Sequence, residues 1–217
     1  MARSTEASPR ACLEALGLAE PAVCALDAYL GLLSAWSRKV NLTAARSPAA
    51  RVDLLIRDVL PLIDLLAPGD IMDVGSGNGS PGLILGVLAP DRAVTLLEPR
   101  MRRFVFLREA ARAVGRPDIQ VLRLRHDEVV APPVANLTVR ALRVPAPELA
   151  RLMAPGGRIL ALGALPPGSE GFRARQVGIA GRGFVHVLER GDVPRETVTA
   201  SEPPDGPPGG GEARVLS

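Results

Sequence analysis

The fold class of this chain is decided by one stretch, Asp73-Val74-Gly75-Ser76-Gly77-Asn78-Gly79-Ser80-Pro81-Gly82. It separates an apolar segment of strand length, residues 71–74, from an apolar segment of helical length, residues 82–88. Where a strand turns sharply into a helix against a ligand, side chains are excluded and glycine is required. The free N–H groups of the helix start point at this turn and suit a carboxylate or phosphate. The motif therefore predicts a strand–turn–helix unit whose turn binds a ligand.

Strands and helices alternate after this motif. The expected strands lie at residues 93–97, 119–124, 134–139 and 157–162, and the expected helices at 82–88, 100–114 and 147–153. Alternation at this spacing is typical of βαβ units and predicts a doubly wound, mostly parallel sheet of the α/β class. Two more strands, 184–189 and 213–216, complete seven, with the last placed beside 184–189 after a Pro/Gly-rich loop at 201–211. The alternative is that the final residues extend freely.

The first 67 residues have a helical pattern instead. Residues 21–40 carry apolar side chains at helical spacing, and Ser47-Pro48 is a cap followed by a first-turn proline that begins a second helix. Pro61 is expected to break that helix, with a short helical turn at 62–66. We therefore predict an N-terminal helical extension over 1–67 and an α/β domain over 68–217.

Composition excludes several classes of protein. With 47% hydrophobic residues in 217, the chain supports a sizeable core and is neither disordered nor fibrous. Cys12 and Cys24 belong to no CxxC motif or Cys/His cluster, so we predict no metal site and a reducing compartment. The N-terminus lacks the apolar region of a secretory signal, and no apolar run reaches membrane length. A cytoplasmic protein without a membrane partner is expected.

Charge is distributed unevenly along the chain. Between Arg100 and Arg125, eight arginines face only Glu109 and Asp118, which gives this segment +6, whereas the whole chain carries +3. A basic patch of this kind suits a polyanion such as RNA. The alternative is a solvated helix face, which the charges alone favour. Only 3% of the residues are aromatic, so base stacking on many side chains is excluded.

A second signal for the ligand is Glu98, 23 residues after Gly75 and at the end of the next expected strand. In doubly wound nucleotide-binding folds, an acidic side chain there accepts hydrogen bonds from ribose hydroxyls. Residues 77–82 formally match the dinucleotide pattern GxGxxG, but Gly75 opens the turn, and counted from it the third glycine falls on Ser80. The spacing resembles instead the pattern D-x-G-x-G-x-G, which predicts S-adenosylmethionine. NAD, and a glycine turn without ligand, are the less favoured alternatives.

The predicted cofactor-binding residues in this part of the chain are Asp73, Gly75, Ser76, Gly77, Gly79 and Glu98. Together with four other segments they resemble the bacterial 16S rRNA guanine-N7 methyltransferases, also called the glucose-inhibited division protein B family. The other segments are Trp36 with Asn41-Leu42-Thr43, residues 95–98 with 102–107, residues 125–128, and Val139-Arg140-Ala141. The order and spacing of these five segments, from about residue 29 to 164, make the resemblance specific.

The resemblance implies a class I methyltransferase with a Rossmann-like fold that acts on 16S rRNA or the 30S subunit. It implies that His126 and Asp127 border the adenine of the cofactor. Arg140 is expected to contact both cofactor and substrate and is the predicted catalytic residue. We further expect Arg57, Arg102 and Arg103 to contact RNA, and the protein to act as a monomer.

Methyl transfer to guanine N7 needs few chemical groups. This atom has an in-plane lone pair and no proton, so an in-line displacement requires alignment and a dry, shaped site but no general base. The sequence agrees, since it offers neither a Ser/His/Asp set nor a metal cluster. Arg140 is suited to donate to guanine O6 or to a phosphate. The alternative for Arg140 is a strand-end arginine in a structural ion pair.

The chain departs from the family pattern at three places. Arg57 to Leu62 keeps only the arginine of the family's RHxxDS, with Asp58 and Pro61 at two of the changed positions. Asn136 stands where the family favours Asp, and Gly163-Ala164 replaces Lys-Gly. The alternatives are therefore a homologue that binds cofactor or RNA with weak or no methyl transfer, or a methyltransferase with another substrate.

Overall fold

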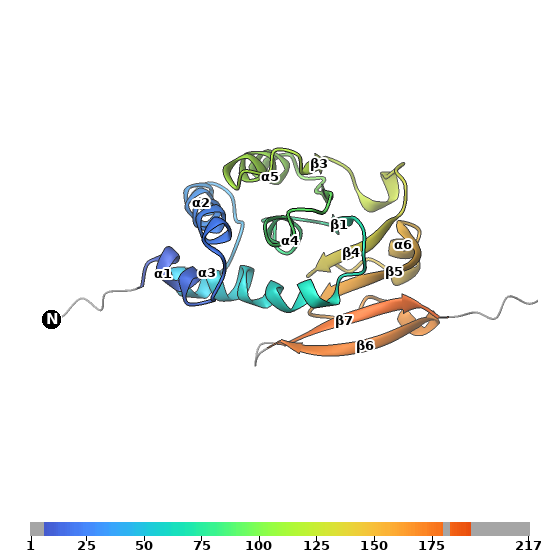
Figure 1. The fold of residues 1–217 in the computed structure, drawn as a ribbon. Coiled ribbons are helices and arrows are strands. Elements are labelled where there is room, and N and C mark those ends of the chain that lie inside the picture. The colour runs from blue at the N-terminus through green and yellow to red at the C-terminus, as the bar shows by residue number, and fades with distance from the viewer. Residues whose placement is uncertain (1–6, 180–182, 192–217) are drawn as a thin grey trace, which may run out of the picture.

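The computed structural model describes residues 7–179 and 183–191, which form one sheet with helices on both faces (Figure 1). The strands are β1 (Ile71–Val74), β2 (Val94–Leu97), β3 (Gln120–Leu122), β4 (Val134–Arg140), β5 (Met153–Leu162), β6 (Phe172–Ile179) and β7 (Gly183–Arg190). Their order is β3-β2-β1-β4-β5-β7-β6, with β1 to β5 parallel and β7 antiparallel to both neighbours. The predicted seven-stranded, mostly parallel α/β fold is confirmed.

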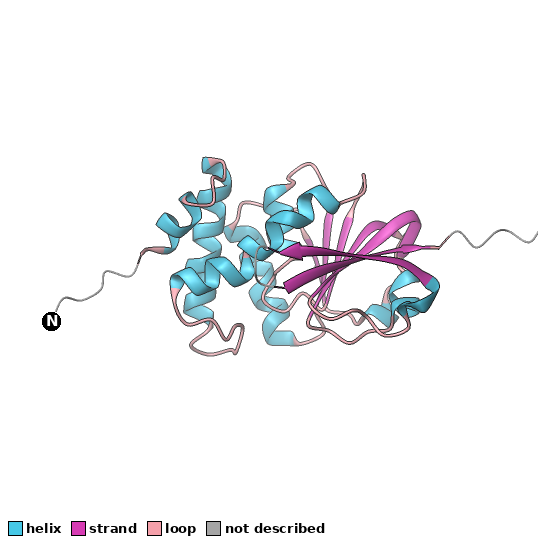
Figure 2. Cartoon of the chain, turned by 90° about the horizontal axis from the view of Figure 1, so that it is seen from below, coloured by secondary structure: helices cyan, strands magenta, loops and turns pink. Residues whose placement is uncertain are grey.

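The helices include those predicted at 21–40, 82–88, 100–114 and 147–153, found within a few residues, as well as short ones that the sequence did not predict. They are α1 (Pro9–Glu14), α2 (Glu20–Trp36), α3 (Pro48–Leu55), α4 (Gly82–Leu88), α5 (Met101–Ala113) and α6 (Ala146–Ala150), with 3-10 helices η1 (Arg57–Leu65), η2 (His126–Glu128) and η3 (Ser169–Gly171). Figure 2 shows most of the helices gathered at one end of the molecule and the sheet towards the other, with shorter helices beside the strands. No helix in the described ranges is long and apolar enough to cross a membrane.

The direction of winding changes at β1. This strand pairs with β2 on one side and β4 on the other, and all four of its residues are buried. In open α/β sheets the ligand binds outside the carboxyl ends of the strands at such a switch point. The turn after Val74 and the residues after Arg140 are therefore the expected location of the site.

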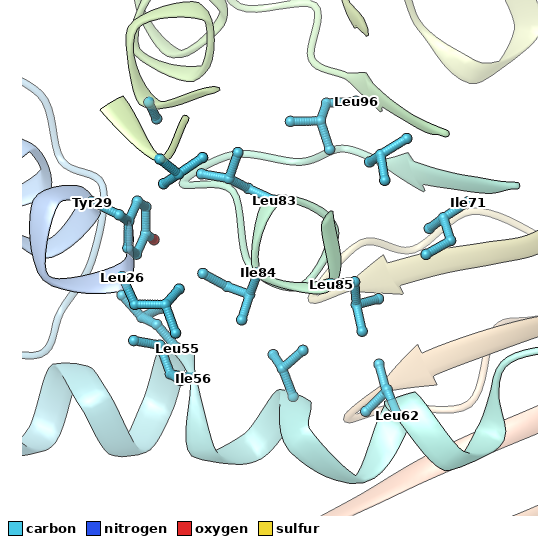
Figure 3. Packing of buried hydrophobic residues seen from close by; sticks show 14 of the residues in the cluster. Leu26, Tyr29, Leu55, Ile56, Leu62, Ile71, Leu83, Ile84, Leu85 and Leu96 are labelled. Carbon is cyan, nitrogen blue, oxygen red and sulfur yellow. The ribbon is translucent and has the colours of Figure 1, made fainter. Parts of the chain in front are cut away.

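The N-terminal helices cover α4 and share its core. Helix α4 is apolar all round, and Leu83, Ile84 and Leu85 are fully buried. Figure 3 shows Leu26 and Tyr29 of α2 on one side of α4, and Leu55 and Leu62 from α3 and η1 below it. A helix that is apolar on every face must be covered on every face. The sheet covers one side of α4, the N-terminal helices cover another, and Arg116 and Ile119 contact Gly86 near its end.

Two local predictions need correction. The second helix does not continue to a break at Pro61: α3 ends at Leu55, and Pro61 lies inside η1. Short 3-10 turns use i→i+3 bonds, and here they tolerate a residue without an N–H. The strand beside β7 is β6, which the sequence did not predict because its side chains are mostly exposed and show no apolar alternation. The predicted loop at 201–211 and strand at 213–216 lie outside the described residues.

Candidate functional site

The turn after β1 has the backbone conformation that its glycines suggest. The φ angles of Gly75, Gly77 and Gly79 are 74°, 55° and 97°, in the left-handed region that side chains disfavour. Gly82, at the start of α4, is required for another reason: a Cβ there would lie 2.4 Å from the Cβ of Asp73. The turn is thus fixed both by its own conformation and by close packing on β1.

Glu98 connects this turn to the end of β2. Its carboxylate is buried, with Oε2 accepting from the Gly77 amide at 3.0 Å and Oε1 accepting from the Arg100 amide at 2.9 Å. A carboxylate has about four lone-pair positions, so each oxygen keeps capacity for another donor. Glu98 also lines the cavity described below. Its predicted contact with ribose hydroxyls stays a prediction.

Asp73 lies behind the turn and does not line the cavity. Its Oδ1 accepts from Thr138 Oγ1 at 2.6 Å, and its side chain is almost wholly buried. Burial raises the pKa of Asp73 to about 6, against the opposing hydrogen bonds from Thr138, Ser76 and the Gly82 backbone. In this position Asp73 supports the turn from below. Its predicted contact with the cofactor ammonium stays a prediction.

Arg140 ends β4 and is held on two sides. Its Nη1 donates to Ser80 Oγ at 3.0 Å, and its Nη2 lies 3.2 Å from Asp58 Oδ2. Ser80 Oγ in turn donates to the Leu55 carbonyl at 2.8 Å. The side chain of Arg140 lines the cavity and is 21% exposed, whereas that of Asp58 is 8% exposed. Arg140 thus lines the cavity and also forms an ion pair, which was the alternative role given for it above.

The residues after Arg140 fold back over the turn. Ala141 has a φ of 51°, a strained value for a residue with a Cβ. Leu142 then packs so close to Gly75 that a Cβ there would lie 2.8 Å from Leu142 Cδ2. Sequence reasoning missed Leu142, because an exposed apolar residue after a strand carries no pattern of its own.

Of the two residues predicted to border the adenine, only His126 lines the cavity. His126 lines the cavity, and its Nε2 lies 2.7 Å from Glu148 Oε2 on α6. Asp127 is exposed and does not line the cavity; its carboxylate pairs with Arg125 at 3.1 Å, which lowers the pKa of Asp127. Glu148 was not predicted, since only the fold brings α6 beside η2.

These residues surround a cavity of about 820 Å³. Ligand pockets span roughly 300–1,000 Å³, so the volume suits a nucleoside cofactor together with part of a substrate. Of the predicted cofactor residues, the cavity wall contains Gly75, Ser76, Gly77, Glu98, His126 and Arg140. Gly79 is buried behind it, as Asp73 is. Among the described residues, no group of three or more His, Cys, Asp or Glu side chains could hold a metal ion.

The three predicted RNA-contacting arginines lie apart. Arg103 lines the cavity, and its Nη2 donates to the Asn41 carbonyl at 3.3 Å. Arg102 is exposed on α5 outside the cavity wall. Arg57 lies on η1, where its Nε donates to Asp53 Oδ1 at 2.8 Å. The structure therefore brings only Arg103 to the candidate site.

The N-terminal segment closes one side of the cavity. Leu42, Thr43 and Ala44 line it, and Asn78 Nδ2 in the glycine turn donates to the Leu42 carbonyl at 3.0 Å. Tyr29 Oη on α2 donates to the Asn78 carbonyl at 2.9 Å. The glycine turn is therefore bonded to the helical extension as well as to the sheet.

Comparison with known proteins agrees with this geometry. Residues 23–172 match the family model described as rRNA small subunit methyltransferase G. The curated "Ribosomal RNA small subunit methyltransferase G" of Halorhodospira halophila is 39% identical over 145 residues, which cover 65% of this chain and 69% of that protein. That of Leptothrix cholodnii is 34% identical over 168 residues, covering 72% and 77%. The solved structure of MtNAS in complex with MTA and tNA is 16% identical, covers 76% of this chain and 68% of that chain with a TM-score of 0.50, and shows likeness of fold alone.

Proposed function

Because the chain belongs to the rRNA small subunit methyltransferase G family, we propose that it transfers a methyl group from S-adenosylmethionine to N7 of a guanine in 16S ribosomal RNA. The observation that carries the proposal is the cavity at the switch point of the sheet. Its wall combines the glycine turn, the buried carboxylate of Glu98 and the guanidinium of Arg140. These groups suit a nucleoside cofactor on one side and a polar base on the other.

The residues present fit S-adenosylmethionine, which supplies an electrophilic methyl group on a sulfonium. Gly77 leaves its backbone open to a ligand, Gly75 lies on the cavity wall beneath Leu142, and Glu98 keeps lone pairs for ribose hydroxyls. His126, held by Glu148, would lie beside the adenine. Ser76 completes the predicted set on the cavity wall, while Asp73 and Gly79 would act from behind it.

In the transfer itself, the chain has to align the base rather than move a proton. The N7 lone pair forms the new C–N bond as the S–C bond breaks, and the positive charge passes from sulfur to the base. Arg140 has five N–H donors, and the contacts to Ser80 and Asp58 leave some of them for guanine O6. We therefore propose that Arg140 is the catalytic residue that orients the guanine. The buried carboxylate of Asp58 would hold its guanidinium in place.

The wider assignments rest on the same family membership. The substrate would be 16S rRNA, free or in the 30S subunit, bound by a cytoplasmic monomer. Arg57, Arg102 and Arg103 remain proposed RNA contacts, and the extension at 1–67 and the methyltransferase domain at 68–217 remain proposed units. The contact of Arg103 with the Asn41 carbonyl supports a role for this arginine where the extension meets the cavity.

The proposal is tested by offering the purified protein 30S subunits and 16S rRNA that lack 7-methylguanosine, with methyl-labelled S-adenosylmethionine. We expect label at N7 of a guanine in the rRNA. Calorimetry in parallel should show binding of S-adenosylmethionine and none of NAD. Tight cofactor binding without transfer to either substrate would instead favour a binding homologue or another substrate.

A further inference from the structure

A second cavity, of about 640 Å³, lies beside the first and is strongly basic. It is bordered by the end of α2 and the segment leading to α3, and its wall includes Arg38, Lys39, Arg46 and Arg51. We call it the N-terminal basic cavity. The segment that forms it is distinct from α5, where the positive charge of residues 100–125 is concentrated.

Charge in this region is unbalanced over a long stretch. Residues 28–52 contain these four basic residues and no Asp or Glu, so the stretch carries +4. The end of α2 adds the partial negative charge of a helix C-terminus, roughly half an elementary charge. The four full positive charges exceed this partial negative charge. Among the described residues, no acidic side chain lines the cavity.

The cavity is also built, rather than a chance gathering of surface side chains. Arg51 Nε donates to the Ala45 carbonyl at 3.1 Å, and its Nη1 donates to Ser34 Oγ, which ties the segment to α2. Ser37 lines the same cavity, and its Oγ is buried without a hydrogen-bond partner in the described part of the chain. Buried polar atoms without partners are rare in folded chains.

The position of the cavity suggests its ligand. Thr43 and Ala44 line both this cavity and the proposed cofactor cavity, so the two are adjacent. We propose that the N-terminal basic cavity binds phosphodiester groups of the RNA next to the target nucleotide and so positions the substrate. The identity of that RNA rests on the proposed function, whereas binding of its phosphates rests on the cavity itself.

A charge-matched pair of variants tests the proposal. Arg38→Gln/Arg46→Gln removes two exposed charges from the cavity, and Arg173→Gln/Arg175→Gln removes two exposed charges from β6 at the far edge of the sheet. For a 16S rRNA transcript, we expect the first pair to raise Kd roughly tenfold and to lower the salt dependence of binding by about one to two phosphate contacts. The β6 pair should stay within about twofold of wild type, and S-adenosylmethionine should bind all three proteins equally. Equal effects of both pairs, or an unchanged Kd for the first, would overturn the proposal.

Lys39 permits a second test on the unaltered protein, because it is the single lysine of the chain and is exposed. Acylation of its amine, followed by peptide mass spectrometry, should be slowed at least severalfold by the transcript and unaffected by S-adenosylmethionine or equimolar inorganic phosphate. Acylation at an unchanged rate with RNA bound would contradict the proposal. Both tests measure RNA binding, so protection without methyl transfer would reject the proposed function alone. If methyl transfer occurs, but RNA does not protect Lys39 and the Arg38→Gln/Arg46→Gln pair keeps its affinity for RNA, this inference alone is rejected.

Discussion

At the scale of single residues, the site depends on side chains that are held by neighbours far away in the sequence. Arg140 is fixed by Asp58, 82 positions earlier, and by Ser80. Asp58 is one of the positions at which the sequence departs from the family pattern, yet the structure gives it a definite partner. The sequence comparison indicated the loss of a polar group at this position, but in the structure Asp58 forms a largely buried ion pair with Arg140.

Replacing Arg140 with lysine should lower kcat by roughly 10–100-fold. A lysine keeps the positive charge but cannot span Ser80 and Asp58 while also donating to a base, because it lacks the planar fork of a guanidinium. Methyl transfer to 16S rRNA under saturating cofactor measures the loss. Arg151→Lys, at an exposed position after α6, is the matched control and should retain wild-type kcat. A kcat within twofold of wild type for Arg140→Lys would show that Arg140 has only a structural role, in its ion pair with Asp58.

Asp73 should make stability depend on pH in a predictable direction. Its pKa is about 6 in the folded chain against 3.8 as the ordinary value, so the folded state holds the proton more tightly. The contribution of this group to stability therefore falls as the pH rises from about 4 to above 6, by about 3 kcal/mol at most. Asp73→Asn keeps an acceptor for Thr138 and stays neutral.

Urea unfolding of both proteins at pH 4 and pH 8 tests this prediction. The free energy of unfolding of the variant, relative to wild type, should be more favourable at pH 8 than at pH 4 by roughly 1–3 kcal/mol. Asp91→Asn, at an exposed carboxylate, is the control and should show no such difference. A relative stability that is independent of pH would mean that Asp73 is ionised at little cost in the folded chain.

At the scale of elements, the site depends on how closely α4 approaches β1. The helix begins at Gly82, directly above Asp73, and this contact sets the height of the glycine turn over the sheet. Apolar residues on every face of α4 then fix its position between the sheet and the N-terminal helices. The proposed cofactor side of the cavity is thus positioned by packing as much as by hydrogen bonds.

Gly82→Ala should destabilise the protein by about 3 kcal/mol. The added methyl group would lie 2.4 Å from Asp73 Cβ and 2.6 Å from Leu96 Cδ2, and neither the strand nor a packed core can yield that space without cost. Thermal unfolding should show a Tm lower by roughly 6–12 °C for a chain of this size. Gly178→Ala on β6, where a Cβ meets nothing within 4 Å, should change Tm by about 1 °C or less. Equal Tm values for the two variants would show that α4 can move away from β1.

At the scale of the whole molecule, the parts that sequence could predict are those with a local pattern. The glycine turn, the parallel strands and the place of Glu98 follow from glycine spacing and apolar runs, and each is found. Strand β6 has no such pattern. It is an edge strand, and most of its side chains, including Arg173 and Arg175, are exposed to solvent. The pairing of Arg140 with Asp58, and of His126 with Glu148, was not predictable, since only the folded chain brings those segments together.

The N-terminal helices share one hydrophobic core with the α/β domain, across the predicted boundary between residues 67 and 68. Leu26, Tyr29, Leu55 and Leu62 pack in the same cluster as Leu83 and Ile84 of α4 (Figure 3). Removing residues 1–67 would expose these faces of α4, and each fully buried large apolar side chain contributes about 1.5–3 kcal/mol. Loss of several such contacts equals the net stability of a typical domain.

We therefore expect the chain 68–217 to lack a cooperative unfolding transition and to bind S-adenosylmethionine at least 100-fold more weakly than the full chain. The turn would also lose the hydrogen bonds from Tyr29 to the Asn78 carbonyl and from Asn78 to the Leu42 carbonyl. Circular dichroism during urea unfolding and calorimetry with the cofactor measure the two effects, with the chain 7–217 as the control. Cooperative unfolding of 68–217 with full cofactor affinity would show instead that the α/β domain folds and binds the cofactor without the helical extension.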